Sequence, residues 1–209
     1  MGEFVKGSPN ALYGDKAQEI VIKYICENYG WKWLAGERNS ETKNENIFSM
    51  FKNFLKITNK NDLGKNIGTN LMFEYIDSEG WPIYTFLILP DELFLTPNNK
   101  NKFLEIKGRN HSIQQSKMFE KCNKIDGYSK TKRELNTPVF LVFCIEKING
   151  YNIYSADIDE AIFLAQKSTR YYLDSNRQEV YCPVYVWETP KGFDKINKNI
   201  IPLDYLDNQ

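Results

Sequence analysis

An unbroken apolar run near the middle of the chain most constrains the fold. After Pro138, the seven residues from Val139 to Ile145 are all apolar. A short run without alternating polar residues is typical of a strand that is buried on both faces of a sheet. Helical patterns elsewhere in the chain supply the elements that would cover such a sheet. We therefore expect an α/β protein with a mixed central β-sheet flanked by helices.

The helical patterns lie on both sides of the sheet-forming part of the sequence. Residues 15–29 carry an apolar stripe at helical spacing, with Asp15 and Gln18 as an N-terminal capping box and Gly30 as the stop signal. A second amphipathic helix is predicted over 46–57, followed by a loop to Asn70 that is rich in Asn, Lys and Gly. Further helices are predicted over 112–135 and 157–167.

The strand patterns frame these helices. Residues 71–76 and 82–89 form a predicted hairpin around the turn at 77–80. A strand follows Asp91, and the turn-rich stretch 96–101 brings a second strand, 103–107, back beside it. Residues 151–154 are predicted to pair with the buried run through the Asn149-Gly150 turn, and a last strand covers 180–187.

Two carboxylates and an amine are brought together by this hairpin. Asp91 is separated from Glu105 by thirteen residues, and Lys107 follows two positions later. Alternate side chains of a strand share a face, so Glu105 and Lys107 project together while Ile106 is buried behind them. Hard divalent cations such as Mg²⁺ need only one or two protein carboxylates when waters and phosphate oxygens complete the shell. This pattern predicts metal-assisted phosphodiester hydrolysis, with Lys107 orienting water, holding phosphate or neutralising developing charge.

Pro90-Asp91 and Glu105-Ile106-Lys107 resemble the motif of the PD-(D/E)xK nuclease superfamily, which includes restriction endonucleases, junction resolvases and repair nucleases. The resemblance extends over residues 14–145 and implies a restriction-endonuclease-like core in the order αβββαβ, with residues 71–107 as the strand meander. It implies metal-dependent endonuclease activity with Mg²⁺ as cofactor and Mn²⁺ able to substitute. Asp91, Glu105 and the backbone carbonyl of Ile106 would bind the metal, Lys107 would be the catalytic lysine, and Glu19 is a further metal-ligand candidate.

Charge distribution favours a nucleic-acid partner although the formal net charge is zero. Residues 98–133 contain ten basic and three acidic side chains, and the flanking parts of the chain are net acidic. Such a cluster can follow phosphates, although a solvated lysine-rich helix face is an equal alternative. The candidates for nucleic-acid contact are Arg109, Asn110, His111, Gln114, Lys117, Lys121, Tyr128, Lys130 and Lys132.

Length and composition are those of one well-cored domain. We expect a flexible or non-native leader over 1–13 and a single nuclease-like domain over 14–209, with an insertion at about 37–70 and a C-terminal extension from about 150. The four cysteines are widely spaced, which favours buried thiols in a reducing compartment over a zinc site. These features indicate a cytoplasmic protein without membrane association.

Alternatives remain at this level. Glu105 and Lys107 would also be explained by an ordinary ion pair on an exposed hairpin. The same fold could serve as a non-catalytic module that binds nucleic acid or protein. DNA is favoured over RNA as the substrate, and a homodimer is a possible assembly.

Overall fold

The computed structural model describes residues 9–36, 70–76, 79, 82–110, 117–173, 178–188 and 191–207. Three helices are described: α1 (Pro9–Tyr29), α3 (Cys122–Glu134) and α4 (Ile158–Leu164). The strands, in chain order, are β1 (Lys32–Gly36), β2 (Asn70–Ile76), β3 (Pro82–Ile88), β4 (Glu92–Leu95), β5 (Asn101–Asn110), β6 (Lys117–Lys121), β7 (Val139–Lys147), β8 (Gly150–Asp157), β9 (Gln166–Leu173), β10 (Glu179–Glu188) and β11 (Asp194–Lys195). No described helix is long and apolar enough to cross a membrane.

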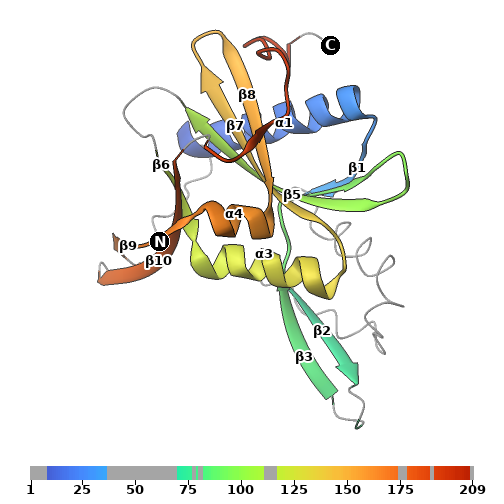
Figure 1. The fold of residues 1–209 in the computed structure, drawn as a ribbon, viewed down its shortest axis with the longest axis vertical. Helices are drawn as coiled ribbons and strands as arrows, with labels where there is room; N and C mark the ends of the chain where they lie inside the picture. Colours follow the sequence, from blue (N-terminus) through green and yellow to red (C-terminus); the bar gives the residue numbers. More distant parts are fainter. Residues whose placement is uncertain are drawn as a thin grey trace.

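A six-stranded sheet forms the centre, in the order β1-β4-β5-β7-β8-β11. The central pair β5 and β7 is parallel, and the other neighbours are antiparallel. Figure 1 shows α1 on one face of this sheet and α3 with α4 on the other. The predicted α/β class, with a mixed central sheet flanked by helices, is confirmed. Two smaller sheets, β6-β10-β9 and β2-β3, extend from the centre.

The apolar run on β7 is explained by a core on each side of the sheet. Leu141 and Phe143 pack in the cluster that contains the buried residues of α3 and α4. Val142 and Cys144 pack in the cluster that contains the buried stripe of α1. Because both faces of β7 are covered, apolar residues at every position are favourable, and the alternation expected of a half-exposed strand is lost.

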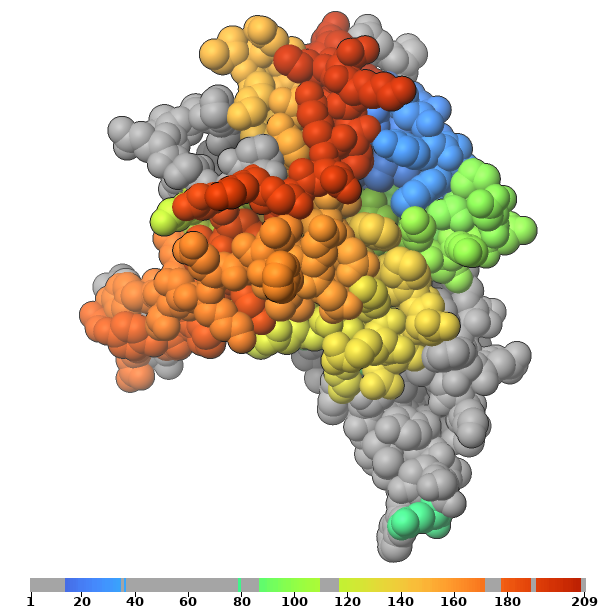
Figure 2. Space-filling model, in the orientation of Figure 1, coloured from blue at the N-terminus to red at the C-terminus, as the bar shows by residue number. Residues whose placement is uncertain are grey.

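Helices α3 and α4 lie side by side across one face, as Figure 2 shows in yellow and orange. Lys132 of α3 bridges the two helices through Asp157 at 2.5 Å and Asp159 at 2.7 Å. Asp157 is also the N-cap of α4, and its side chain accepts a hydrogen bond from the backbone N–H of Asp159. Lys132, expected to contact nucleic acid, is therefore engaged in an ion pair that holds α3 against α4.

The predicted start of one helix and the predicted end of another were wrong. Helix α1 begins at Pro9, so Asp15 lies inside it and is not the N-cap. Its end is confirmed, since Gly30 has a φ of 64°, which glycine adopts without strain. Helix α4 stops at Leu164, and residues 166–173 form strand β9, which pairs with β10 along its length.

The predicted meander was wrong in its first strand. Residues 71–76 and 82–88 do pair as a hairpin, but in a sheet of their own, and β1 takes the place beside β4. The buried carboxylate of Glu92 stabilises this pairing by accepting a 2.7 Å hydrogen bond from the indole N–H of Trp33. Gly36 makes room for that carboxylate, because a Cβ there would lie 2.0 Å from Oε2 of Glu92.

The long helix predicted over 112–135 was also wrong. Residues 117–121 form strand β6, whose partner is β10, and helix α3 begins only at Cys122. Met118 is buried and Lys117 is exposed, which is the alternation expected of a strand with one face on the core and the other toward solvent. The pairing partner lies more than sixty residues away, so local helix signals were overridden by long-range strand pairing. The predicted helix over 46–57 lies outside the described residues.

Two glycines inside helices make a matched test of this packing. A Cβ at Gly127 of α3 would lie 2.5 Å from Cδ1 and 3.1 Å from Cβ of Ile88, whereas Gly14 of α1 has open space around it. We expect Gly127→Ala to destabilise the protein by about 1–3 kcal/mol through overpacking against β3. Gly14→Ala should instead stabilise it by about 0.5–1 kcal/mol through helix propensity. Urea unfolding of both variants measures the difference, and equal effects would contradict the close contact between α3 and β3.

Candidate active site

Asp91 and Glu105 are joined where β4 separates from β5. The two strands are paired up to Glu92 and Leu104, so Asp91 and Glu105 occupy the next positions. There the backbone hydrogen bonds between the two strands are replaced by two backbone-to-side-chain hydrogen bonds, each 3.2 Å long. The backbone N–H of Asp91 donates to Oε2 of Glu105, and the backbone N–H of Ile106 donates to Oδ2 of Asp91. Both carboxylates are thereby held at the start of β4, and both are buried.

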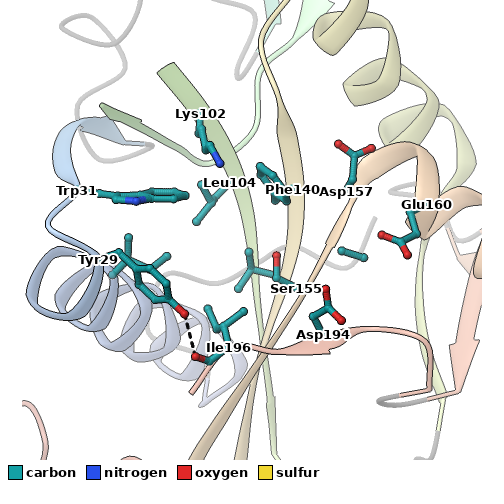
Figure 3. A pocket seen from close by; sticks show the side chains of 13 residues that line it. Tyr29, Trp31, Lys102, Leu104, Phe140, Ser155, Asp157, Glu160, Asp194 and Ile196 are labelled. Atoms are coloured by element: carbon teal, nitrogen blue, oxygen red, sulfur yellow. Dashed lines mark hydrogen bonds between the residues drawn. The ribbon is translucent and has the colours of Figure 1, made fainter. Parts of the chain in front are cut away.

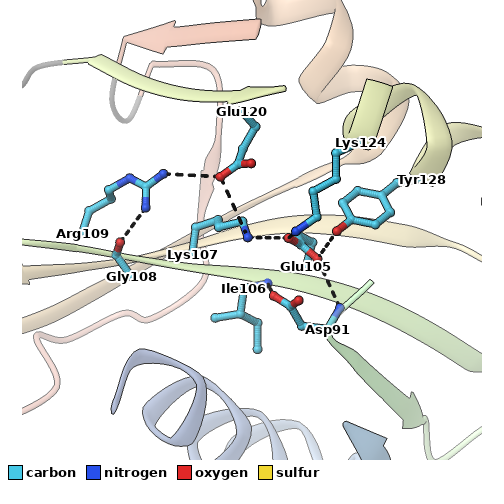
Figure 4. Close-up of polar contacts among 9 residues, drawn as sticks. All are labelled: Asp91, Glu105, Ile106, Lys107, Gly108, Arg109, Glu120, Lys124 and Tyr128. Carbon is cyan, nitrogen blue, oxygen red and sulfur yellow. Dashed lines mark hydrogen bonds and ion pairs between the residues drawn. The ribbon is translucent and has the colours of Figure 1, made fainter. Parts of the chain in front are cut away.

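Glu105 is fully buried, and its two oxygens have different partners. Oε1 is contacted by the ammonium groups of Lys107 at 2.5 Å and Lys124 at 2.9 Å. Oε2 accepts hydrogen bonds from Tyr128 at 2.6 Å and from the N–H of Asp91. Figure 4 shows these groups converging on one carboxylate from β5, α3 and the start of β4. Burial acts to raise the pKa of Glu105, but Lys107 and Lys124 outweigh it and hold that pKa well below its ordinary value.

Lys107 stays protonated in this environment. Burial acts to lower the pKa of Lys107, but the negative charges of Glu105 and Asp91 outweigh it and raise that pKa. Glu120 of β6 adds a weaker contact at 3.9 Å. The same Glu120 oxygen lies 3.7 Å from the guanidinium of Arg109, which projects from the same face of β5 two residues further on. Lys107 can therefore act as a cation toward an anionic group but is a poor base near neutral pH.

Tyr128 is a support for Glu105 and does not reach the surface. It was expected to contact nucleic acid, but its side chain is fully buried and its hydroxyl donates to the carboxylate. Burial, and next the negative charge of Glu105, raise the pKa of Tyr128 well above its ordinary value. The hydroxyl therefore remains a hydrogen-bond donor to Glu105.

Removing this hydroxyl should cost more stability than removing a similar one nearby. We expect Tyr128→Phe to lower the free energy of unfolding by about 1.5–3 kcal/mol, because a buried carboxylate loses a donor. Tyr185→Phe is the matched control, since its hydroxyl donates at 2.8 Å to Asp126, an exposed carboxylate that water can satisfy. Its loss should cost about 1 kcal/mol or less. Denaturant unfolding compares the two, and an equal or larger loss in Tyr185→Phe would show that Glu105 does not need the Tyr128 hydroxyl.

Other expected site residues are not gathered with the two carboxylates. Glu19 is exposed on α1, the helix that covers the opposite face of the sheet from Glu105. Lys117 and Lys121 lie an odd number of positions from Glu120 on strand β6. Their side chains therefore point to the opposite face from the one on which Glu120 meets Lys107. Lys130 is half-buried on α3. His111, Gln114 and the side chain of Asn110 lie outside the described residues.

Two residues of α3 contact Glu105 directly, a role that the sequence did not indicate for either of them. Lys124 and Tyr128 stand one helical turn apart on α3, and Glu120 precedes that helix on β6. The spacing of Lys124 and Tyr128 is the usual signal for side chains that share a helix face. It gave no indication of Glu105 as their common partner, because that contact joins residues about twenty positions apart across the sheet–helix interface.

The donor atoms around Asp91 and Glu105 suit a hard divalent cation. No group of three or more His, Cys, Asp and Glu side chains gathers at metal-binding distance within the described part of the chain. Two buried carboxylates are nevertheless enough for a Mg²⁺ site of the kind that substrate and water complete. The two ammonium groups at Oε1 of Glu105 indicate that this position attracts positive charge. Asp91 and Glu105 therefore fit the metal that the motif implies.

A pocket of about 270 Å³ lies on the other face of the sheet (Figure 3). Its floor includes Leu104 and Phe140, and Trp31 forms a wall. The ammonium of Lys102 lies 4.8 Å from the ring centre of Trp31 and 5.0 Å from that of Phe140. Even-numbered positions of β5 face this pocket and odd-numbered ones face α3, so the sheet separates the pocket from Glu105. The pocket is not part of the candidate active site.

Comparisons with known proteins give little independent information. No family model matches the sequence, and no curated protein matches it. Among solved structures, the chain is similar to Hjc, a Holliday junction resolvase from the archaeal hyperthermophile Archaeoglobus fulgidus, at 6% sequence identity. The match covers 74% of this chain and 92% of the other, with a TM-score of 0.33. Because that score is low, the function has to be inferred from the residues of this chain.

Proposed function

We propose that this protein is a metal-dependent endonuclease that hydrolyses phosphodiester bonds in nucleic acid, with DNA favoured over RNA. The proposal rests on the convergence of Asp91, Glu105 and Lys107 at one buried point. Two carboxylates supply oxygen ligands for a divalent cation, and an ammonium group beside them can meet a phosphate oxygen. A structural ion pair would not need Asp91 to be fastened to Glu105 as well.

Each residue of the motif has a distinct role in this proposal. Asp91, Glu105 and the backbone carbonyl of Ile106 would hold Mg²⁺, for which Mn²⁺ would substitute. When bound, such an ion polarises a phosphoryl oxygen and lowers the pKa of a coordinated water. Lys107, which stays protonated, would bind the scissile phosphate and balance the charge that develops on it. Asp91 and Glu105 also fix each other's position before any substrate arrives.

Arg109 would contact the nucleic-acid backbone in this proposal. It lies two positions beyond Lys107 on the same face of β5, and its side chain is 34% exposed. Its guanidinium can form paired hydrogen bonds with phosphate oxygens. A phosphate next to the scissile one would fall within reach of Arg109. Two such sites, one on each subunit of a homodimer, would cut both strands of a duplex.

The test is cleavage of supercoiled, linear and single-stranded DNA, and of RNA, in Mg²⁺, in Mn²⁺ and in chelator. We expect products from DNA only when a divalent ion is present. Asp91→Asn should remove the activity, because it removes the charge of a metal ligand but keeps an acceptor for the N–H of Ile106. The matched control is Asp194→Asn, an exposed carboxylate on β11, which should cleave normally. Cleavage that persists in chelator, or is unchanged in Asp91→Asn, would contradict the proposal.

One observation favours a non-catalytic binding module as the alternative. Both oxygens of Glu105 already have partners within the protein, and the charges of its lysines balance the buried carboxylates. A network of this kind can also serve stability alone. The alternative predicts nucleic-acid binding in chelator, measured by fluorescence anisotropy, without product under any metal condition.

A further inference from the structure

Oε1 of Glu105 is the atom with the most unusual surroundings in the site. Two ammonium groups approach this one oxygen, from Lys107 at 2.5 Å and from Lys124 at 2.9 Å. Among the described residues, the donors to the other oxygen are neutral: the hydroxyl of Tyr128 and the N–H of Asp91. A single carboxylate needs one counter-charge, so the second ammonium at Oε1 exceeds what Glu105 itself requires. Figure 4 shows the two lysines arriving from different elements, β5 and α3.

The two lysines are not equivalent. Lys107 comes from the middle of the central sheet, is 17% exposed and has Glu120 as a second carboxylate nearby. Lys124 comes from the first turn of α3 and is 31% exposed. Within the described part of the chain, Lys124 pairs with Glu105, and its ammonium also lies 5.6 Å from the ring centre of Tyr128. Lys124 can therefore leave Oε1 toward solvent by a change of rotamer, whereas Lys107 is held in place from two sides.

The charge balance shows why one lysine would have to leave. Among the described residues around Glu105, Asp91, Glu105 and Glu120 carry three negative charges, and Lys107, Lys124 and Arg109 carry three positive charges. A divalent cation on Asp91 and Glu105 would add two positive charges to a partly buried and already neutral cluster. Positive charges a few ångströms apart repel strongly at such a site. Release of the more exposed ammonium is the smallest rearrangement that halves this excess of positive charge, and it frees Oε1 as a ligand.

We propose that Lys124 is an exchangeable counter-cation of Glu105. It occupies Oε1 while no divalent ion is bound, holds the buried carboxylate in position, and is displaced when the ion arrives. The displaced ammonium then lies at the mouth of the site, where it can pair with an incoming phosphate group. This inference rests on the proposed function, because it assumes a divalent ion at Asp91 and Glu105. It goes beyond that function by making metal affinity a competition with one side chain of α3.

The test is the affinity for Mn²⁺ without substrate, measured by titration calorimetry on the full chain. Lys124→Gln removes the charge but keeps a hydrogen-bond donor for Oε1, so the fold should be retained. We expect it to bind Mn²⁺ at least about fivefold more tightly than the wild type, because the variant no longer places a positive charge a few ångströms from the ion. Lys124→Arg, which keeps the charge, should bind Mn²⁺ about as weakly as the wild type.

Lys132→Gln is the matched control. It lies on the same helix, has similar exposure and loses the same charge, but its partners are Asp157 and Asp159 of α4. Its Mn²⁺ affinity should equal that of the wild type. If wild type and Lys124→Gln bind Mn²⁺ equally, or the variant binds more weakly, Lys124 is not a competitor and the inference is overturned while the proposed metal site stands. If neither protein binds Mn²⁺, the metal site fails, and the inference fails with it.

A second readout covers the case in which Lys124→Gln folds poorly. Thermal unfolding with and without Mn²⁺ measures the stabilisation by the ion, which increases with affinity for the folded state. The increase in Tm caused by Mn²⁺ should be larger in Lys124→Gln than in the wild type, even if the Tm without metal is lower. A smaller increase in the variant would overturn the inference.

Discussion

Lys107→Ala is expected to reduce the rate of DNA cleavage about 10³-fold, the effect of removing a charge that stabilises the transition state. The ammonium of Lys107 is the cation best placed to meet the scissile phosphate, since it lies 2.5 Å from a proposed metal ligand. The raised pKa of this group keeps it charged at neutral pH. Single-turnover cleavage in Mg²⁺ measures the change directly.

The control for Lys107→Ala is Lys102→Ala. Both lysines lie on β5, but Lys102 faces the side of the sheet covered by α1, so its loss should leave the cleavage rate within about twofold. The fold of Lys107→Ala should persist, because Glu105 keeps Lys124 and Tyr128 as partners. A Lys107→Ala protein that is folded and cleaves at the wild-type rate would remove this lysine from the mechanism.

Glu105→Ala is expected to have the largest effect on stability, about 3 kcal/mol or more. The substitution leaves Lys107 buried without its closest counter-charge and leaves Tyr128 without an acceptor. Because the pKa of Glu105 is depressed in the folded state, its contribution is complete above the ordinary carboxyl pKa of 4.5 and declines as the pH falls below it. Urea unfolding at pH 7 and at pH 4 should therefore show a smaller difference from the wild type at the lower pH.

A double variant separates the loss of the pair from the cost of an unpaired charge. Glu105→Leu with Lys107→Met replaces the ion pair by apolar side chains and leaves no buried ammonium from β5. It should be more stable than Glu105→Ala, because most of the single-variant cost comes from the unpaired cation. A double variant that is less stable than Glu105→Ala would show that Glu105 acts mainly through its other partners, Tyr128 and the N–H of Asp91.

These experiments distinguish the two explanations of the same ion pair. If the site is catalytic, Lys107→Ala loses activity with a small effect on stability, while Glu105→Ala loses both. If the network serves stability alone, no cleavage is found in the wild type, and the effects are confined to unfolding. The contacts of Glu105 predict the stability changes in either case, so the cleavage assay is the deciding measurement.

The predictions that succeeded from sequence depended on local periodicity. The run from Val139 to Ile145 gave a central strand, now β7, because such a run is stable only when both faces are covered. The turn after β4 formed where Asn and Pro are concentrated, with Asn99 in the left-handed region at a φ of 55°. These signals act within a few residues and need no knowledge of distant partners.

The predictions that failed depended on the choice of a partner. Residues 117–121 became strand β6 because β10 offers an edge to pair with. Strand β1 entered the central sheet in place of β3 because Trp33 and Gly36 accommodate the buried carboxylate of Glu92. Strand pairing is decided by burial and packing over long separations, which intrinsic propensity does not encode.

The same division applies to the candidate site. The sequence by itself determined that Glu105 and Lys107 share one face of a strand, because side chains alternate along it, and that Asp91 returns beside them. Only the tertiary structure decided which groups meet that face. Packing of α3 against the sheet brings Lys124 and Tyr128 to Glu105, and β6 brings Glu120 to Lys107. Local geometry therefore specified the motif, whereas its charge balance arises from helix and strand packing between residues distant in the chain.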